Sequence, residues 1–269
     1  MKIWISGYGS IGKRHHGILQ QLFSKATFEI NDPTQRMSSA LTGNYDIGLI
    51  CTDTANHLDV AASLKNKCGL IFIEKPLHSS VQEIKKFENI LKNCPIHVGS
   101  NVRYTPAVQQ LKKIKDQARM VRVTAMSNLL MWRNDPKKDA YSFHKSKGGG
   151  VLVDFIHEPD YISDVFGIPK TAMVSERRLH NSVTVDSTDS CMMLWEYEKT
   201  TASFCLSYSS VDYVRKVEVL QEDGREVKFD ITKSDIEESY KKQWEDILAN
   251  GPKNTYQHCL ELYQKILET

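Results

Sequence analysis

The stretch KIWISGYGSIGKRHHGIL, residues 2–19, decides the fold of the N-terminal half. Its first five residues, Lys2–Ser6, form a short apolar run typical of a buried strand, and apolar residues recur at helical spacing from Ile11 onward. Between strand and helix, residues 7–12 read GYGSIG and fit G-x-G-x-x-G. A glycine turn that joins a strand to a helix in this way predicts a phosphate-binding site.

Each glycine of this turn has a predicted role. Gly7 permits the tight turn, Gly9 lets a pyrophosphate approach the backbone, and Gly12 allows close packing of helix and strand. The N-terminus of the helix supplies oriented N–H groups for the anion. We therefore assign the whole turn to the cofactor site: Gly7, Tyr8, Gly9, Ser10, Ile11 and Gly12.

Asp32 lies 20 residues beyond Gly12, at the end of a second strand-like run. A carboxylate there can hold the adenosine ribose hydroxyls and repels a 2′-phosphate, which favours NAD. Arg14 and Arg36 are near enough in sequence to accept a 2′-phosphate, so NADP stays open as the alternative cofactor.

The pattern of short runs divides the chain in two. Strand and helix patterns alternate up to about residue 118, which predicts a doubly wound parallel sheet of the Rossmann type. From residue 119 on, consecutive strands with alternating apolar residues are followed by two helices, which predicts an α+β domain with an open mixed or antiparallel sheet. We thus expect a dinucleotide-binding domain, residues 1–118, and a domain for substrate and subunit contacts, residues 119–269.

Composition excludes several classes of protein. Basic residues number 35 and acidic residues 33, so the charge balance gives no reason to expect nucleic acid or a membrane surface as partner. The six cysteines form no CxxC pair, which argues against a cysteine-based zinc site. The first strand-like run begins at Lys2, so we expect no signal peptide and a cytoplasmic protein.

Residues 70–77 read LIFIEKPL and predict a central strand that ends at Glu74 and Lys75. In an open α/β sheet the carboxyl ends of the strands line the ligand crevice, so Lys75 is a candidate catalytic residue near the cofactor. The alternative is a surface lysine paired with Glu74.

Three glycines, residues 148–150, lead into VLVDFIHEPDYISDVFG. On a helix this stretch has one apolar stripe and, on nearly the opposite side, a polar stripe of Asp154, His157 and Tyr161. A histidine flanked by carboxylates can act as a general acid or base, whereas the alternative is a solvated face. Pro159 predicts a kink because it removes an N–H and collides with the carbonyl of Phe155. A metal site at this histidine is disfavoured, since no second histidine lies at ligand spacing.

The segment of residues 132–147 is rich in basic residues, including Arg133 and Lys145. A guanidinium there suits bidentate capture of a carboxylate or phosphate, so Arg133 is a candidate contact for an anionic or strongly polar group of a substrate. A solvated basic loop is the alternative.

Taken together, these motifs resemble the Gfo/Idh/MocA family of oxidoreductases. The resemblance rests on five stretches spread over most of the chain: GYGSIGKRH (7–15), CTDTANH (51–57), EKPL (74–77), GSNVRYTPAV (99–108) and GGGVLVDFIHEPDY (148–161). It implies a Rossmann domain followed by a mixed-sheet domain. In the family the histidine usually follows the aspartate by four residues, whereas His157 follows Asp154 by three.

The resemblance implies roles for further residues. Lys75 matches the family's EKP lysine, and His157 matches its catalytic histidine. Asp154 is the third implied catalytic residue. Thr52, His57 and Glu74 join the implied cofactor site, and four residues form the implied substrate site: Arg103, Arg133, Tyr141 and Tyr161.

The implied activity is that of an NAD(P)-dependent oxidoreductase acting on a hydroxyl or keto carbon of a sugar or nucleotide sugar. A subgroup linked to surface-polysaccharide or nonulosonic-acid biosynthesis is the more specific expectation, and a homodimer or homotetramer formed through the C-terminal sheet is the expected assembly. The alternatives are a dinucleotide-binding sensor without turnover and a glycosidase that uses NAD transiently.

Overall fold

The computed structural model describes residues 1–37, 39–129, 141–179 and 186–268. The chain forms two compact units, and each unit combines separate segments of the sequence. Unit 1 comprises Met1–Ser100 and Tyr240–Leu260, and unit 2 comprises Asn101–Ser239 and Glu261–Thr269. The predicted boundary at residue 118 therefore differs from the observed one, and a segment near the C-terminus returns to the N-terminal unit.

Unit 1 contains a parallel sheet of five strands in the order β2-β1-β3-β4-β5. The order reverses between β1 and β3, and ligands of open α/β sheets bind outside the carboxyl ends of the strands at such a point. The predicted doubly wound parallel sheet is thus confirmed. Its strands are β1 (Lys2–Ser6), β2 (Thr27–Asn31), β3 (Tyr45–Ile50), β4 (Cys68–Ile73) and β5 (Ile96–Val98).

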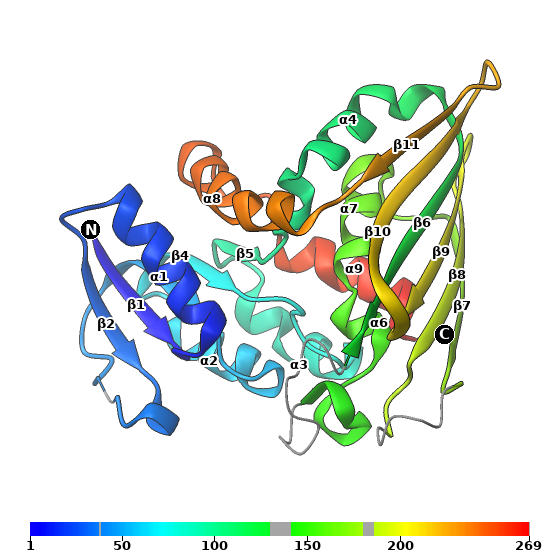
Figure 1. Ribbon diagram of the computed structural model, residues 1–269. Helices are drawn as coiled ribbons and strands as arrows, with labels where there is room; N and C mark the ends of the chain where they lie inside the picture. The colour runs from blue at the N-terminus through cyan, green and yellow to red at the C-terminus, as the bar shows by residue number, and fades with distance from the viewer. Residues whose placement is uncertain (38, 130–140, 180–185, 269) are drawn as a thin grey trace. The chain divides into compact units, whose positions relative to one another are not determined.

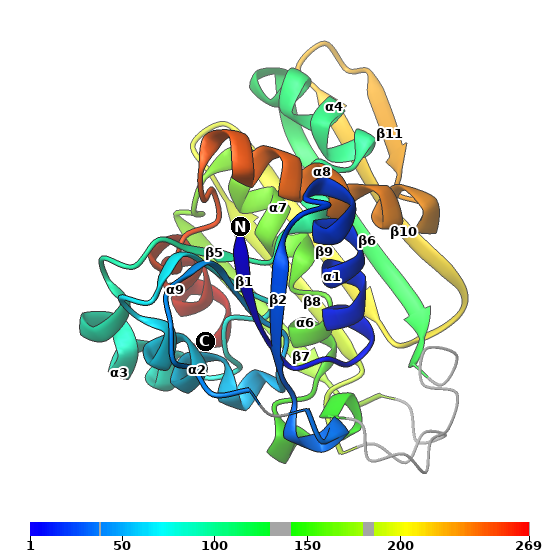
Figure 2. The ribbon, with the colours of Figure 1, turned by 90° about the vertical axis from the view of Figure 1, so that its left-hand side faces the viewer.

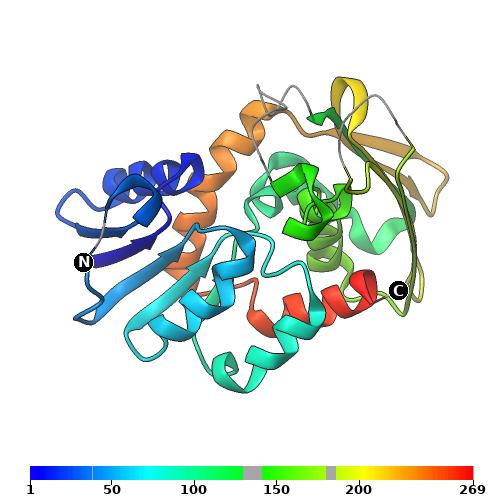
Figure 3. The ribbon, with the colours of Figure 1, turned by 90° about the horizontal axis from the view of Figure 1, so that it is seen from below.

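Helices cover both faces of this sheet, as Figures 2 and 3 show, with α1 on one side and α2 and α3 on the other. The core on the α1 side contains Leu19 of α1 together with Trp244 and Ile247 of α8, packed on Ile3 and Ile5. Because α8 completes this core, residues 240–260 belong to unit 1. The helices are α1 (Ser10–Leu22), α2 (His57–Leu64), α3 (Val81–Leu91), α8 (Lys233–Asn250) and α9 (Tyr256–Leu267), the last two shared between the units.

Unit 2 contains a six-stranded sheet in the order β11-β10-β6-β9-β8-β7. Only β6 and β9 pair in parallel, and all other neighbours are antiparallel. The predicted mixed sheet is confirmed. Its strands are β6 (Ala118–Asn128), β7 (Thr171–Arg177), β8 (Ser190–Glu196), β9 (Thr201–Ser207), β10 (Ser209–Gln221) and β11 (Glu226–Asp230).

Figure 1 shows α6 and α7 against one face of this sheet. On the other face, large apolar side chains are exposed, with Met120 at 51%, Met173 and Met192 at 57% and Leu194 at 39%. The register places these residues on the same side of β6, β7 and β8, because Arg122, Ser203, Leu194 and Met173 are cross-strand neighbours. The sheet is therefore open on one face, as the alternating pattern predicts.

Residues 151–166 form two helices rather than one, α6 (Val151–Asp154) and α7 (His157–Phe166). Pro159 has no N–H, and the carbonyl of Phe155 instead accepts the N–H of Glu158 at 3.1 Å. The predicted kink is confirmed as a break at Phe155 and Ile156. The remaining helices of unit 2 are α4 (Pro106–Ile114), η3 (Asn101–Tyr104), η4 (Lys115–Gln117), η5 (Tyr141–Phe143) and η6 (Lys145–Lys147), and unit 1 adds η1 (Pro33–Gln35) and η2 (Thr54–Asn56).

Within the described parts of the chain, no helix combines the length and the apolar character needed to cross a membrane.

Two glycines of α1 provide a test of its packing. A Cβ atom at position 12 would lie 2.3 Å from the carbonyl oxygen of Gly7, whereas one at position 17 would meet nothing within 4 Å. We expect Gly12→Ala to lower the free energy of unfolding by several kcal/mol, because backbone must shift. Gly17→Ala should raise it by about 0.5–1 kcal/mol through helix propensity. Urea denaturation measures both, and equal stability of the two variants would contradict the proposed close packing.

Candidate functional site

The glycine turn follows β1 at the point where the strand order reverses. Gly7 has a φ of +85°, and a Cβ atom there would lie 2.4 Å from the carbonyl oxygen of Cys51 at the end of β3. Gly12 is held equally close to Gly7, as described above. At Gly9, in contrast, a Cβ atom would meet nothing within 4 Å. Two glycines are thus required by the chain itself, and the third borders open space.

The first turn of α1 carries no side-chain cap. Its N-cap is Gly9, which makes no side-chain cap hydrogen bond, and the first turn has no acidic residue. The N–H groups of this turn and the positive end of the helix dipole favour an anion. The open space beside Gly9 and the uncapped helix therefore fit a pyrophosphate.

Asp32 lies 6% exposed at the end of β2, beside this turn. Its Oδ2 atom accepts the backbone N–H of Tyr8 at 2.6 Å, and its Oδ1 atom accepts the hydroxyl of Thr34 at 2.5 Å. The backbone N–H groups of Thr34 and Gln35 and the amide of Gln35 add three longer bonds. The carboxylate thus supports the turn and η1, and a ribose hydroxyl would have to share oxygens that already accept five bonds.

These bonds also keep Asp32 ionised. The Thr34 hydroxyl holds the pKa of this carboxyl below its usual range, and the backbone N–H groups of Tyr8, Gln35 and Thr34 add to this effect against the opposing influence of burial. A negative charge therefore stands beside the glycine turn near neutral pH. Close by, the hydroxyl of Tyr8 lies 2.5 Å from Nδ1 of His16.

His57 connects two of the predicted cofactor-site segments. Its Nδ1 atom lies 2.9 Å from the carbonyl oxygen of Pro76, and its Nε2 atom lies 3.0 Å from that of Thr52. Burial lowers the pKa of His57, and the two carbonyls, which raise it, do not compensate. His57 therefore lies between the segment after β3 and the segment after β4, and as a neutral ring it donates to one of the two carbonyls.

Glu74 and Lys75 follow β4 directly, and the Lys75–Pro76 peptide bond is cis. Glu74 is 8% exposed, and Lys75 is half-buried. Burial raises the pKa of Glu74, but the hydrogen bond with His15 and the charge and backbone N–H of Lys75 together lower it by more, so that it lies below its usual range. Glu74 is thus a buried carboxylate bonded to His15 and not a solvated surface group.

Sequence reasoning missed His15 and Trp244. His15 stands in the quoted glycine-turn stretch, but its partner Trp244 follows 229 residues later. No periodicity links two residues at that separation. The only available signal was that a histidine falls three residues after Gly12, on the buried face of α1.

In unit 2, the predicted polar stripe is buried rather than solvated. Asp154 is 5% exposed and accepts the hydroxyl of Tyr208 at 2.5 Å, and His157 is 8% exposed at the first residue of α7. Tyr161 is fully buried, and burial raises the pKa of its hydroxyl. The solvated-face alternative is therefore wrong. Tyr161 also offers no exposed surface to a substrate, which does not fit its implied role.

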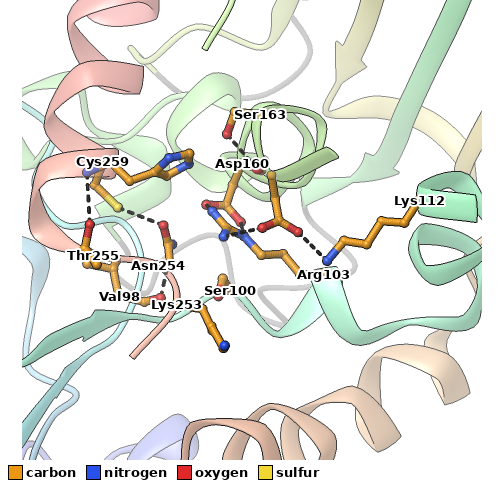
Figure 4. A network of polar contacts seen from close by, with 12 residues as sticks. Val98, Ser100, Arg103, Lys112, Asp160, Ser163, Lys253, Asn254, Thr255 and Cys259 are labelled. Carbon is orange, nitrogen blue, oxygen red and sulfur yellow. Dashed lines mark hydrogen bonds and ion pairs between the residues drawn. The ribbon is translucent and has the colours of Figure 1, made fainter. Parts of the chain in front are cut away.

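Arg103, an implied substrate contact, is bonded to two carboxylates of α7. Its guanidinium binds Asp160 through two bonds of 2.7 Å and Asp164 through one of 2.9 Å. Lys112 lies 2.6 Å from the other oxygen of Asp164, and Figure 4 shows Arg103, Asp160 and Lys112 in this network. The network ties α7 to η3 and α4. A second buried pair joins Arg215 and Glu158 at 2.6 Å.

Two of the implied substrate contacts have no described side chain. Arg133 lies outside the described residues, and of Tyr141 only the backbone is described. Among residues 1–37, 39–129, 141–179 and 186–268, no group of three or more His, Cys, Asp or Glu side chains is arranged to hold a metal ion. Lys75 belongs to unit 1 and His157 to unit 2.

Comparison with known proteins agrees with this architecture. Residues 108–226 match the model of the GFO/IDH/MocA C-terminal domain. The rhizopine catabolism protein MocA of Rhizobium meliloti is 26% identical over 126 residues, which span 44% of this chain and 37% of that protein. The predicted resemblance to the Gfo/Idh/MocA family is therefore confirmed.

Solved structures match nearly the whole chain. A myo-inositol dehydrogenase from Corynebacterium glutamicum has a TM-score of 0.80 at 14% identity, covering 100% of this chain and 96% of that one. The WlbA dehydrogenase from Bordetella pertussis, in complex with NADH and UDP-GlcNAcA, has a TM-score of 0.79 at 16% identity, with coverage of 97% and 92%. An oxidoreductase from Agrobacterium radiobacter, in complex with NAD+, L-tartaric acid and magnesium, has a TM-score of 0.78 at 16% identity, with coverage of 100% and 94%. At these identities the likeness shows the fold.

The hydrogen bonds of Asp32 predict a pH-dependent stability. Because its pKa is lower in the folded protein, its contribution is fully present above the unfolded pKa of about 3.9 and is lost as pH falls through the folded value. We expect Asp32→Asn to lower the free energy of unfolding by about 1–2 kcal/mol near pH 7, with a gap to wild type that closes by about pH 2. Urea denaturation across this range measures the gap. Thr34→Val should show a smaller version of it, and a gap independent of pH would contradict the assignment.

Proposed function

We propose that this protein is an NAD-dependent oxidoreductase that acts on a hydroxyl or keto carbon of a sugar or nucleotide-sugar derivative. One observation carries the cofactor proposal: the open space beside Gly9 lies at an uncapped helix N-terminus next to an ionised Asp32. The first two features favour a pyrophosphate, and the third disfavours an additional 2′-phosphate.

The sugar-type substrate is supported by the solved structures of similar fold. They include inositol dehydrogenases and a dehydrogenase bound to NADH and a nucleotide sugar. We also propose, from the sequence resemblance, that the protein belongs to a subgroup linked to surface-polysaccharide or nonulosonic-acid biosynthesis.

The proposed chemistry assigns separate tasks to two residues. Bound NAD+ would supply the acceptor for a hydride from the substrate carbon that carries the hydroxyl group. Lys75, as an ammonium, donates a hydrogen bond to the substrate oxygen and stabilises the negative charge that develops there. His157 accepts the hydroxyl proton on its imidazole, so the alcohol becomes a carbonyl. Asp154 is the last residue of α6, three residues before His157, and is proposed to position His157.

Replacement of Lys75 by methionine tests this function. Lys75→Met keeps the side-chain length, so the fold and NAD binding should be retained, whereas turnover should fall about 100-fold because the donor to the reacting oxygen is lost. Turnover of a panel of sugars and nucleotide sugars and calorimetric titration with NAD(H) and NADP(H) measure the two effects. We expect NAD(H) to bind more tightly than NADP(H).

Two control variants sharpen the experiment. Lys92→Met makes the same change at an exposed position of unit 1 and should leave turnover unchanged. Gly9→Ala adds a methyl group to open space, so it should keep the stability of wild type but lose NAD affinity at least about tenfold. Wild-type turnover in Lys75→Met would refute the catalytic role, and dinucleotide binding with no turnover of any sugar would favour the sensor.

We further propose that the open face of the six-stranded sheet binds a second copy of the chain, which makes the protein a dimer or tetramer. The exposed side chains of Met120, Met173, Met192 and Leu194 support this, since apolar groups gathered on one face favour burial in an interface. Sedimentation should show at least a dimer for wild type and a monomer for the double variant Met173→Glu, Met192→Glu. Ile90→Glu, at an exposed apolar position of α3, should assemble like wild type, and a monomeric wild type would overturn the proposal.

A further inference from the structure

Three buried side chains of unit 1 form a chain of hydrogen bonds that ends at Lys75. The indole N–H of Trp244 donates to Nδ1 of His15 at 2.8 Å, and Nε2 of His15 lies 2.7 Å from Oε1 of Glu74. The backbone N–H of Lys75 donates to Oε2 of the same carboxylate at 3.1 Å. Trp244 comes from α8, His15 from α1 and Glu74 from the end of β4.

The Trp244 indole determines where the His15 proton lies. An indole nitrogen only donates hydrogen bonds, so the Nδ1 atom facing it must be an acceptor without a proton. The neutral ring therefore carries its proton on Nε2, the nitrogen that faces Glu74. This tautomer makes His15 a donor to the carboxylate, whereas the other tautomer would set two acceptors against each other.

The surroundings of His15 fix the ring as well as its proton. His15 and Trp244 are both fully buried. The imidazole lies 5.0 Å from the ring of Phe72, 5.5 Å from that of Tyr240 and 5.8 Å from that of Trp244, measured between centroids. Phe72 in turn stacks on Trp244 at 4.6 Å. A rotation of the imidazole would have to displace three aromatic rings.

The Glu74 carboxylate is confined on its other side by β5 and the residue that follows. A Cβ atom at Gly99 would lie 3.3 Å from the carboxyl carbon of Glu74 and 3.2 Å from the backbone nitrogen of Lys75. The backbone of Gly99 is itself bonded to Ile73 of β4. His15 thus bonds to a carboxylate whose movement is restricted by neighbouring backbone. That carboxylate in turn accepts the backbone N–H of Lys75.

We propose that His15 is a positioning residue for Lys75: through the tautomer imposed by Trp244 it fixes the Glu74 carboxylate, and through Glu74 the backbone at Lys75. This inference rests on the proposed function, in which the Lys75 ammonium meets the reacting oxygen. Without the His15 donor, Oε1 of Glu74 loses the hydrogen bond that fixes the carboxylate, and the Lys75 N–H no longer has an acceptor held in place. A misplacement of about 1 Å at a reacting group can cost about 100-fold in rate.

Trp244→Phe tests the tautomer step with little change in packing, because phenylalanine keeps a ring on Phe72 and removes only the N–H donor and one ring of the indole. We expect the 15N signals of the His15 imidazole to show an Nε2-protonated ring in wild type and a mixed or doubly protonated ring in the variant. The Lys75 amide signal should shift, and its hydrogen exchange should become at least about tenfold faster. Turnover should fall about tenfold, with the KM for the sugar and the Kd for NAD within about twofold of wild type.

Trp4→Phe is the matched control, because Trp4 also lies buried in unit 1 and donates its indole N–H, at 2.8 Å, to a side chain outside the chain of bonds, Ser6. It should leave the His15 signals, the Lys75 amide and turnover unchanged. His15→Leu and His15→Gln form a second pair. The leucine variant should lose about 100-fold in turnover, whereas the glutamine amide, which can donate from nearly the same place as Nε2, should restore most of it.

The readouts separate the two proposals. If wild type turns over no sugar with NAD, the proposed function fails, and the Lys75 amide alone decides the positioning role. A wild-type His15 with its proton on Nδ1, or a Lys75 amide that is unchanged in Trp244→Phe and His15→Leu, overturns the inference. A changed amide with wild-type turnover also overturns it, because the bond would then be structural only.

Discussion

The close approach of the main chain at the carboxyl ends of β1 and β3 is the constraint on which unit 1 depends. Gly7 lies against the carbonyl of Cys51, and Gly12 lies against the carbonyl of Gly7, in both cases with no room for a Cβ atom. This crowding brings α1 close to the end of the sheet and directs its uncapped N-terminus to the place where the strand order reverses. The open space beside Gly9 is the product of that packing.

Much of the fold follows from local pattern. Strand β1 agrees with prediction to the residue, and the alternating runs after residue 118 became strands of one sheet. Periods of 2 and 3.6 can be recognised from neighbouring residues alone. The glycine turn was equally predictable, since its residues are consecutive. Asp32 was found by its spacing, but its five internal hydrogen bonds depend on how Tyr8, Thr34 and Gln35 fold around it.

The features that the sequence did not reveal depend on contacts between distant residues. The polar stripe of Asp154, His157 and Tyr161 has the periodicity of a solvated helix face, and yet it is buried. The neighbouring carboxylates Asp160 and Glu158 are buried too, as ion pairs with Arg103 and Arg215. A buried charge with a partner and a surface charge look the same in a sequence, because the partner is about 60 residues away in each case. The unit boundary was misplaced for a similar reason, because the apolar face of α8 gives no sign of which core it enters.

The return of α8 to unit 1 has a chemical consequence. The indole ring of Trp244 packs on Phe72 in the core, and its N–H donates a hydrogen bond to His15. One side chain therefore contributes both to hydrophobic packing and to the orientation of a polar group. A leucine or phenylalanine would fill the same core but leave the His15 tautomer undetermined. Burial of a polar chain is costly unless every member has a partner, and here each of the three groups has one. Trp244 is therefore better explained by the histidine it orients than by the volume it fills.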